Sequence, residues 1–260
     1  MSSYNNFLNT RRKKFKNLTN LYKDKKDVRK YWSQVGIHQL PQEEALKLKN
    51  KLIYENSWQT IIEALIESGN LHDGERILDA GCGWGRVILG LKKYLPNSHL
   101  VGLDITEKLL DKAQMLITEE TGDAKSVEFI VSDIDSLPFG SGSFDKVISN
   151  RVLQYVPDPL KTISELKKVA KKNGRVIVGI PNKLNPFYTF KYHTKLYSPF
   201  EVKNWFKQLG FSDIKIKIIR FLPFAHHFKL GSKIMILEKI GQRTPLLKWI
   251  GAVILISGKV

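Results

Sequence analysis

Residues 77–86, with the sequence ILDAGCGWGR, join a short apolar run to a glycine-rich turn and then to a helical pattern. The run 77–80 is mainly apolar and contains one acid, Asp79, which is typical of a buried strand. Gly81, Gly83 and Gly85 let the backbone bend sharply and approach a ligand without a Cβ clash. A strand, a glycine turn and a helix start in this order indicate a nucleotide-binding crevice at the carboxyl end of a sheet strand.

Strand patterns alternate with helical patterns along the rest of the chain. The expected strands are residues 77–80, 100–104, 127–131, 144–149, 175–180, 214–219 and 253–256. Alternation at this spacing predicts an α/β fold with a doubly wound, mostly parallel sheet of seven strands. We interpret the last of them, 253–256, as an edge or hairpin strand.

Capping signals support the helices between these strands. Residues 58–69 carry one apolar stripe, and we expect this helix to pack beside the first strand. Thr106 is expected to cap the helix that follows the second strand. Asp158 with Pro159, and Ser198 at the start of a capping box, mark two later helix starts.

Positive charge is concentrated outside the glycine turn. The net charge is +17; residues 1–23 carry six basic residues and no acid, and residues 161–260 carry twenty basic and four acidic residues. Residues 24–160 carry sixteen basic and twenty-one acidic residues. An anionic substrate, nucleic acid or an anionic membrane surface would suit the basic regions, and so would a solvated Lys-rich surface.

The single cysteine, Cys82, excludes an intramolecular disulfide and a Cys-based zinc cluster. We expect a reducing compartment and a packing role for Cys82 in the turn. Residues 1–40 form a basic arm without the apolar core of a signal peptide, and a disordered arm is preferred over a membrane-surface helix or a transit segment. The apolar stretch 246–257 is shorter than the roughly 20 residues that a membrane span needs.

Several motifs together resemble those of the class I S-adenosylmethionine-dependent methyltransferases, in particular the branch of quinone and small-molecule methyltransferases. The resemblance covers residues 58–221 and is specific for the superfamily, not for a substrate. Its motifs are LDAGCGWG at 78–85, GLD at 102–104, Asp133 before LPF at 137–139, SFDKV at 143–147 and NGR at 173–175.

This resemblance implies a Rossmann-like methyltransferase sheet with an N-terminal helical extension. The methyltransferase domain is expected at residues 41–260, after the basic arm. Its cofactor-binding half would lie at about 70–155 and its substrate-side half at about 156–260. The cofactor that the resemblance implies is S-adenosylmethionine.

The resemblance also assigns residues to the methionine end of the cofactor. It places Asp79 near the methionine moiety, with Gly81, Gly83 and Gly85 lining the approach. Asn150, just past the fourth strand, would lie beside the same moiety.

For the nucleoside end, the resemblance implies that Asp104 accepts hydrogen bonds from the ribose hydroxyls and that Asp133 accepts one from the adenine amino group. Ile105 would pack on the adenine ring, with Ile134 beside it. Ionised carboxylates suit these donors because they are acceptors only. The alternative for either acid is that it caps the helix after its strand.

Other enzymes with related patterns fit less well. An NAD-type dehydrogenase would also use Asp104, but its glycines follow G-x-G-x-x-G, whereas these follow G-x-G-x-G. Asn150 is followed by Arg151-Val152, not by the Pro-Pro-aromatic motif of the amino-methyltransferases of DNA. The single cysteine lies in the cofactor loop, which excludes a cytosine C5 enzyme, and the paired glutamates of protein arginine methyltransferases are absent after the fourth strand.

On the substrate side, residues 182–200 are rich in aromatic and basic residues, and would form a wall above the methyl group. His193 in this segment is a weak candidate for a base or an orienting group. Methyl transfer depends on placement and water exclusion more than on a dedicated acid or base, so no other catalytic residue is assigned. No metal is expected.

We therefore expect an S-adenosylmethionine-dependent methyltransferase that acts on a small-molecule, lipid or quinone-like acceptor. An RNA or protein methyltransferase, and a cofactor-binding module without transfer activity, remain the alternatives. The expected location is the cytoplasm, with peripheral contact to an anionic membrane as an open question. Nucleic acid is the less favoured partner, and the sequence does not indicate an oligomeric state.

Overall fold

The computed structural model describes residues 51–123, 127–186, 195–219, 244 and 247–260. The predicted basic arm at 1–40 and the candidate His193 lie outside these residues. Within the described part of the chain, no helix is both long enough and apolar enough to cross a membrane.

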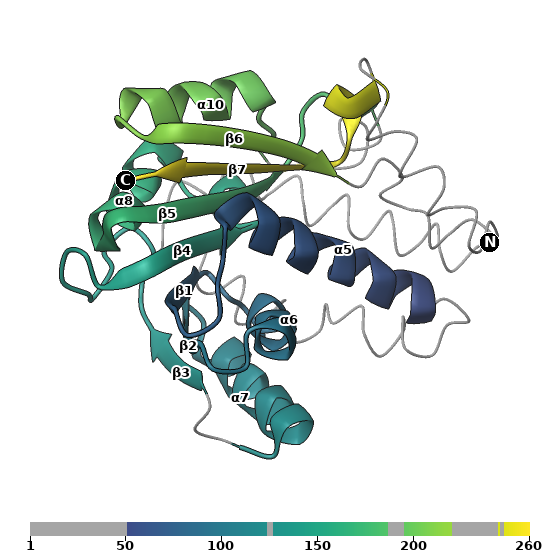
Figure 1. The fold of residues 1–260 in the computed structure, drawn as a ribbon, viewed down its shortest axis with the longest axis vertical. Coiled ribbons are helices and arrows are strands. Elements are labelled where there is room, and N and C mark those ends of the chain that lie inside the picture. The colour runs from purple at the N-terminus through teal and green to yellow at the C-terminus, as the bar shows by residue number, and fades with distance from the viewer. Residues whose placement is uncertain (1–50, 124–126, 187–194, 220–243, 245–246) are drawn as a thin grey trace.

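Seven strands form one sheet in the order β3-β2-β1-β4-β5-β7-β6 (Figure 1). The strands are β1 Arg76–Ala80, β2 His99–Asp104, β3 Val127–Val131, β4 Phe144–Asn150, β5 Ala170–Pro181, β6 Ser212–Ile219 and β7 Val253–Lys259. The first five pair in parallel, and β7 pairs antiparallel with both β5 and β6. The predicted fold class, a mostly parallel seven-stranded α/β sheet, is confirmed.

Helices alternate with these strands in the chain. They are α5 Lys51–Gly69, α6 Arg86–Tyr94, α7 Glu107–Thr121, α8 Pro159–Val169 and α10 Pro199–Gln208, with 3₁₀ turns η1 Leu153–Tyr155 and η3 Leu247–Ile250. Two predicted caps are confirmed. The Asp158 carboxylate accepts from the first amides of α8, and Ser198 and Glu201 form a reciprocal capping box at α10.

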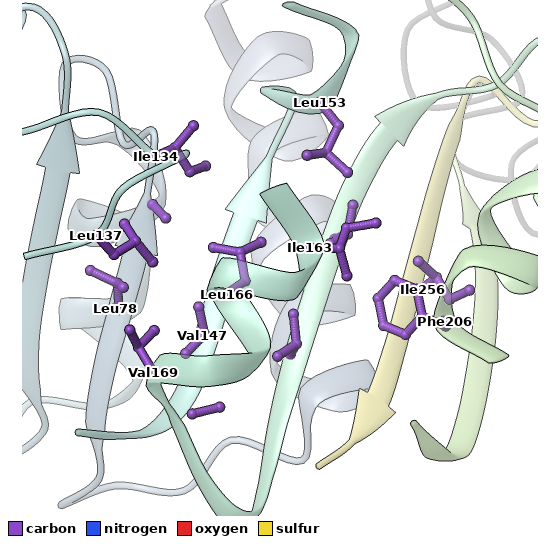
Figure 2. Packing of buried hydrophobic residues seen from close by; sticks show 14 of the residues in the cluster. Leu78, Ile134, Leu137, Val147, Leu153, Ile163, Leu166, Val169, Phe206 and Ile256 are labelled. Carbon is purple, nitrogen blue, oxygen red and sulfur yellow. The ribbon is translucent and has the colours of Figure 1, made fainter. Parts of the chain in front are cut away.

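Successive residues of each central strand point to opposite faces of the sheet, so each face has its own apolar cluster. On one face, Ile77 belongs to an apolar cluster to which α5, α6 and α7 also contribute residues. Its neighbour Leu78 packs with α8 and α10 on the other face, where Phe206 and Ile163 close the layer (Figure 2). The result is a three-layer arrangement in which both faces of the sheet are covered.

Residues 253–256 were expected to form an edge or hairpin strand. The edge alternative is wrong, whereas the antiparallel pairing of β7 with β6 fits the hairpin alternative. β7 lies between β5 and β6, and its residues 253–258 are buried. A short apolar run does not distinguish an edge strand from one that is covered on both faces. The continuous burial of β7 explains why its residues do not alternate between apolar and polar.

Two smaller expectations also need correction. The helix α5 packs mainly over β5, β7 and β6 instead of beside β1, because Gly69 contacts Ile177 of β5 and the Ser257 hydroxyl donates to the Ser68 carbonyl. Thr106 precedes α7, but its side chain makes no capping hydrogen bond. Its backbone amide is instead held by Asp104, which fixes the residue in an extended conformation.

Candidate functional site

Four polar side chains follow one another along the carboxyl edge of the sheet. They are Asp133 just after β3, Asp104 at the end of β2, Asp79 in β1 and Asn150 at the end of β4. Their strands are direct neighbours and run in parallel. Because adjacent strands lie about 5 Å apart, the row extends over about 15 Å. The structure thus brings together the residues that the resemblance assigned to one site.

The glycine turn after β1 is anchored to β2. The amides of Gly81 and Cys82 both donate to the carbonyl of Leu103, at 2.7 and 2.9 Å. Gly81, Gly83 and Gly85 have φ angles of +82°, +55° and +81°. Such left-handed conformations are free of strain only for glycine, which explains the three glycines at these positions.

The glycines differ in what surrounds them. A Cβ placed on Gly81 would lie 2.3 Å from Cγ2 of Val152, so this part of the turn is packed against the segment after β4. A Cβ placed on Gly83 would meet no atom of the described residues within 4 Å, its chain neighbours aside. The turn is therefore closed by protein at Gly81 and open to a ligand at Gly83.

Asp79 is the least compensated charge-bearing group in the row. Its side chain is 1% exposed, and Oδ2 is buried without a hydrogen-bond partner. Burial, and in second place the negative charge of Asp104, raises the pKa of Asp79 to about 8. A buried carboxyl without a partner is unfavourable, and a ligand that brings a positive charge or an N–H donor would relieve the penalty.

Asp104 is instead held by the backbone. Its Oδ2 accepts from the amide of Gly83 and its Oδ1 accepts from the amide of Thr106, both at 2.9 Å. Burial raises the pKa of Asp104, and the two backbone hydrogen bonds oppose this rise. Each carboxylate oxygen can accept a further bond. Asp104 can therefore fix the glycine turn and still bind hydroxyl groups.

The next residues of the row lie in the turn after β3. Oδ1 of Asp133 accepts from the amide of Asp135 at 2.9 Å, which orients the carboxylate. Ile134 is 8% exposed and belongs to the apolar cluster drawn in Figure 2. Ile105 is only half-buried, so it offers more surface to a ligand than Ile134 does.

Asn150 depends on a glycine that the sequence analysis missed. A Cβ on Gly179 of β5 would lie 2.2 Å from Oδ1 of Asn150, so only a glycine leaves room for the amide there. That Oδ1 is buried without a hydrogen-bond partner. The next residue, Arg151, has φ of +63°, and its amide donates to the carbonyl of Gly179. A glycine inside an apolar strand pattern is the signal that could have found Gly179.

Cys82 has the properties expected of a packing residue. Its thiol is buried, and burial together with the charges of Asp79 and Asp104 raises the thiol pKa well above its usual value. A neutral thiol is a poor nucleophile. Among the described residues, no group of His, Cys, Asp and Glu side chains could hold a metal ion.

Comparison with known proteins places this site in a wider context. The sequence model of a family described as a methyltransferase domain matches residues 71–228. A demethylmenaquinone methyltransferase from Lactococcus lactis is 34% identical over 140 residues, which cover 52% of this chain and 55% of that protein. A 2-methyl-6-phytyl-1,4-hydroquinone methyltransferase from Oryza sativa is 29% identical over 162 residues, 60% of this chain and 47% of that protein. The chain thus spans about half the length of these curated relatives.

A solved structure has a similar fold. The magnesium protoporphyrin IX methyltransferase from Synechocystis PCC 6803 superposes with a TM-score of 0.59 over 89% of this chain and 94% of that one, at 19% identity. At this identity the similarity concerns the fold alone. The family match is independent of it, and its range contains the glycine turn and all four polar strand-end residues.

Proposed function

Because the chain belongs to the family of class I S-adenosylmethionine-dependent methyltransferases, we propose that it transfers a methyl group from S-adenosylmethionine to a small lipophilic acceptor of the quinone or lipid type. The observation that carries the proposal is the pairing of Asp79 and Asp104 around an open glycine turn. One carboxyl has a buried oxygen without a hydrogen-bond partner, and the other carboxyl is oriented by two backbone amides.

The residues present fit this cofactor. A ligand with ribose hydroxyls, an adenine amine, an ammonium group and a sulfonium centre brings donors and positive charge, and the row of carboxylates offers acceptors. Asp79 and Gly83 would hold the methionine end, and Asp104 would hold the ribose hydroxyls. Asp133 would accept from the adenine amine, while Ile105 would pack on the ring.

The remaining proposed residues close the methionine end. Asn150 offers a buried acceptor oxygen from β4, across the site from the glycine turn. Gly81 and Gly85 would keep the turn in its left-handed conformation. Ile134 would support Ile105 from the core side. The role of each residue stays a prediction. So does the expected methyltransferase domain at 41–260, with its cofactor-binding half and its substrate-side half.

When bound, S-adenosylmethionine supplies an electrophilic methyl group on a positively charged sulfur. The protein's task is to align the acceptor atom with that methyl group and to exclude water, because in-line displacement depends on placement. Among the described histidines, His72 and His99 lie at the amino edge of the sheet, before β1 and at the start of β2. Neither of them can act as a base at the carboxyl edge.

Two observations support a lipophilic acceptor. The relatives from Lactococcus lactis and Oryza sativa carry the names of methyltransferases for demethylmenaquinone and for 2-methyl-6-phytyl-1,4-hydroquinone. Residues 161–260, which would build the substrate side, carry twenty basic and four acidic residues. Such a surface favours contact with an anionic membrane, where lipophilic acceptors reside.

A labelled-methyl screen tests the proposal. Cofactor labelled in its methyl group is incubated with the protein and with detergent-solubilised cell lipids, polar metabolites or RNA. We expect label in the lipid fraction, loss of labelling for Asp79→Asn, and normal labelling for the control Glu128→Gln, whose side chain is exposed on β3. Label confined to RNA or protein would overturn the acceptor class. Saturable cofactor binding without turnover on any fraction would identify a binding module.

A further inference from the structure

Exposed apolar side chains gather where β5 ends and β7 begins. Phe200 is 62% exposed, Leu184 is 39% exposed and Ile250 is 37% exposed. The Phe200 ring stacks on Trp249 of η3, with centroids 5.3 Å apart and an interplanar angle of 21°. We call Leu184, Phe200, Trp249 and Ile250 the aromatic corner.

Two buried asparagines hold this corner in place. Asn182 is fully buried, and its Nδ2 donates to the carbonyls of Trp249 and Gly251 at 2.8 and 2.7 Å. Asn185 is 1% exposed, and its Nδ2 donates to the carbonyl of Ile250 at 2.6 Å. Asn182 Oδ1 also accepts from the amide of Leu184. The exposed apolar groups therefore sit on a backbone that is fixed by buried hydrogen bonds.

The exposure of Phe200 has no explanation in the packing of the fold. Phe200 follows Pro199 at the start of α10, and the helix anchors itself on the sheet through Val202 and Phe206, which are fully buried. Phe200 instead stays exposed and stacks on a second aromatic ring, that of Trp249. Contiguous exposed apolar groups on a fixed support mark an interaction site.

Basic residues surround the corner and suggest the partner's charge. Lys203 and Lys207 are exposed and follow Phe200 by three and seven residues, which places all three on one face of α10. Lys183 is exposed beside Leu184. The acid at this place, Glu201, is bound in the capping box with Ser198 and lies near Lys183, so its charge is partly compensated.

The corner and the candidate site share one edge of the sheet. Figure 1 shows η3 beyond the arrowhead of β6, at the end toward which the parallel strands run. β5 pairs directly with β4, which carries Asn150 at this same edge. At about 5 Å per strand, the chain leaving β5 lies roughly 5 Å from the end of β4 and roughly 10 Å from the end of β1.

We propose that the aromatic corner docks on an anionic lipid bilayer, with its apolar side chains in the interface and its lysines against the headgroup phosphates. Aromatic residues with adjacent lysines are the composition that binds such surfaces. Docking here would bring the methyl-transfer site within a short distance of a lipophilic acceptor. The delivery of a lipophilic acceptor to the site rests on the proposed function, whereas the docking itself does not.

Vesicle sedimentation tests the docking, with vesicles of phosphatidylcholine alone and with 30% phosphatidylglycerol. We expect binding to the anionic vesicles that weakens with salt. Phe200→Ser should reduce the partition coefficient about fivefold, on the basis of lost apolar burial. Met115→Ser is the matched control, because Met115 is also 62% exposed but lies on α7 at the opposite end of the sheet.

Charge variants make the test independent of any folding defect. Lys203→Glu should reduce binding about fivefold or more, since each basic residue near the surface contributes about 1 kcal/mol. Lys108→Glu on α7 should leave it unchanged. Equal partitioning of the wild-type protein, Phe200→Ser and Lys203→Glu would overturn the proposal. So would a Phe200→Ser variant that changes the sedimentation coefficient without vesicles, because the corner would then contact a second copy.

A separate assay distinguishes failure of the docking from failure of the proposed function. With detergent-solubilised lipid acceptors, the wild-type protein and Lys203→Glu, which lies outside the proposed wall at 182–200, should transfer methyl groups equally, since no bilayer is needed. Absence of transfer in detergent, together with vesicle binding that depends on Phe200, would reject the acceptor class but support the docking. Equal transfer from vesicles by both proteins would reject the docking and leave the function intact.

Discussion

Asp79 should release a proton when the cofactor binds. In the ligand-free protein, burial and the nearby Asp104 raise the pKa of Asp79 to about 8. At pH 7 about nine-tenths of the molecules would then hold a proton on this carboxyl, since one pH unit below the pKa corresponds to a ratio of about ten. Its Oδ2 has no partner that could stabilise the charged form.

A positively charged ligand would favour the charged form of Asp79 over the protonated form. If the methionine end of the cofactor lies at Asp79, its positive charge favours the carboxylate and lowers the pKa. Binding at pH 7 should then release up to about 0.9 proton, and binding at pH 9 about 0.1. The affinity should rise about tenfold between pH 6 and 7 and about tenfold again between pH 7 and 9.

Calorimetry in two buffers measures the released proton directly. At pH 7 the binding enthalpy should differ between phosphate and Tris by the released fraction multiplied by the difference in buffer ionisation enthalpy. Asp79→Asn should bind more weakly and lose the buffer dependence, whereas Glu128→Gln should keep both the affinity and the dependence. Saturable wild-type binding with the same enthalpy in both buffers would refute the assignment of Asp79 to the cofactor.

The same carboxyl should also affect the folding stability. Its folded pKa of about 8 exceeds the ordinary value of 3.8, so between these two values the native state binds more protons than the unfolded state. The free energy of unfolding should therefore fall as pH rises through this window, by up to about 4 kcal/mol at pH 7. Asp79→Asn should lose this fall, which urea unfolding at pH 5 and pH 8 would measure. An equally steep fall of the free energy of unfolding in Asp79→Asn would show that Asp79 does not cause the fall.

Other changes separate binding from folding. Asp104→Ala should weaken cofactor binding by more than about 1 kcal/mol, the scale of lost hydrogen bonds to a charged group, and unchanged affinity by calorimetry would remove Asp104 from the site. Gly83→Ala should lower cofactor affinity with only a small loss in Tm, whereas Gly81→Ala, which forces a Cβ 2.3 Å from Cγ2 of Val152, should lower Tm strongly. A strong loss in Tm for Gly83→Ala with a small loss for Gly81→Ala would refute the interpretation that the turn is open to a ligand at Gly83. Ser198→Ala should cost about 1 kcal/mol of stability through its lost cap, without changing cofactor affinity.

Local rules were sufficient where one residue decides the local geometry. The glycine turn, the capping box at Ser198 and the cap at Asp158 were predicted because each depends on conformations or hydrogen bonds within a few residues. The row of strand-end residues followed from the parallel order of the strands, since carboxyl ends meet at one edge. The resemblance then added which of these residues belong together.

Contacts between segments far apart in the sequence could not be predicted from these local rules. The position of β7 between β5 and β6 depends on two antiparallel ladders that form far apart in the sequence. The placement of α5 over β5 depends on the fit of Gly69 against Ile177. Thr106 has a favourable capping residue type and lies at the N-cap position of α7, but its hydroxyl makes no capping hydrogen bond. The residue type predicted the position and not the bond.

Residues 24–160 and residues 161–260 have opposite net charges, and this gives a reason for their positions at a membrane. Residues 24–160, which contain the proposed cofactor site, carry five more acids than bases, while residues 161–260 carry sixteen more bases than acids. An anionic surface repels the first region and attracts the second, so the field alone would orient the molecule before contact. In that orientation the aromatic corner, which belongs to the basic region, approaches the lipid first. The acidic row that would bind the cationic cofactor stays in water, where the cofactor is supplied. An acceptor from the bilayer and a donor from solution could thus reach one site from opposite sides.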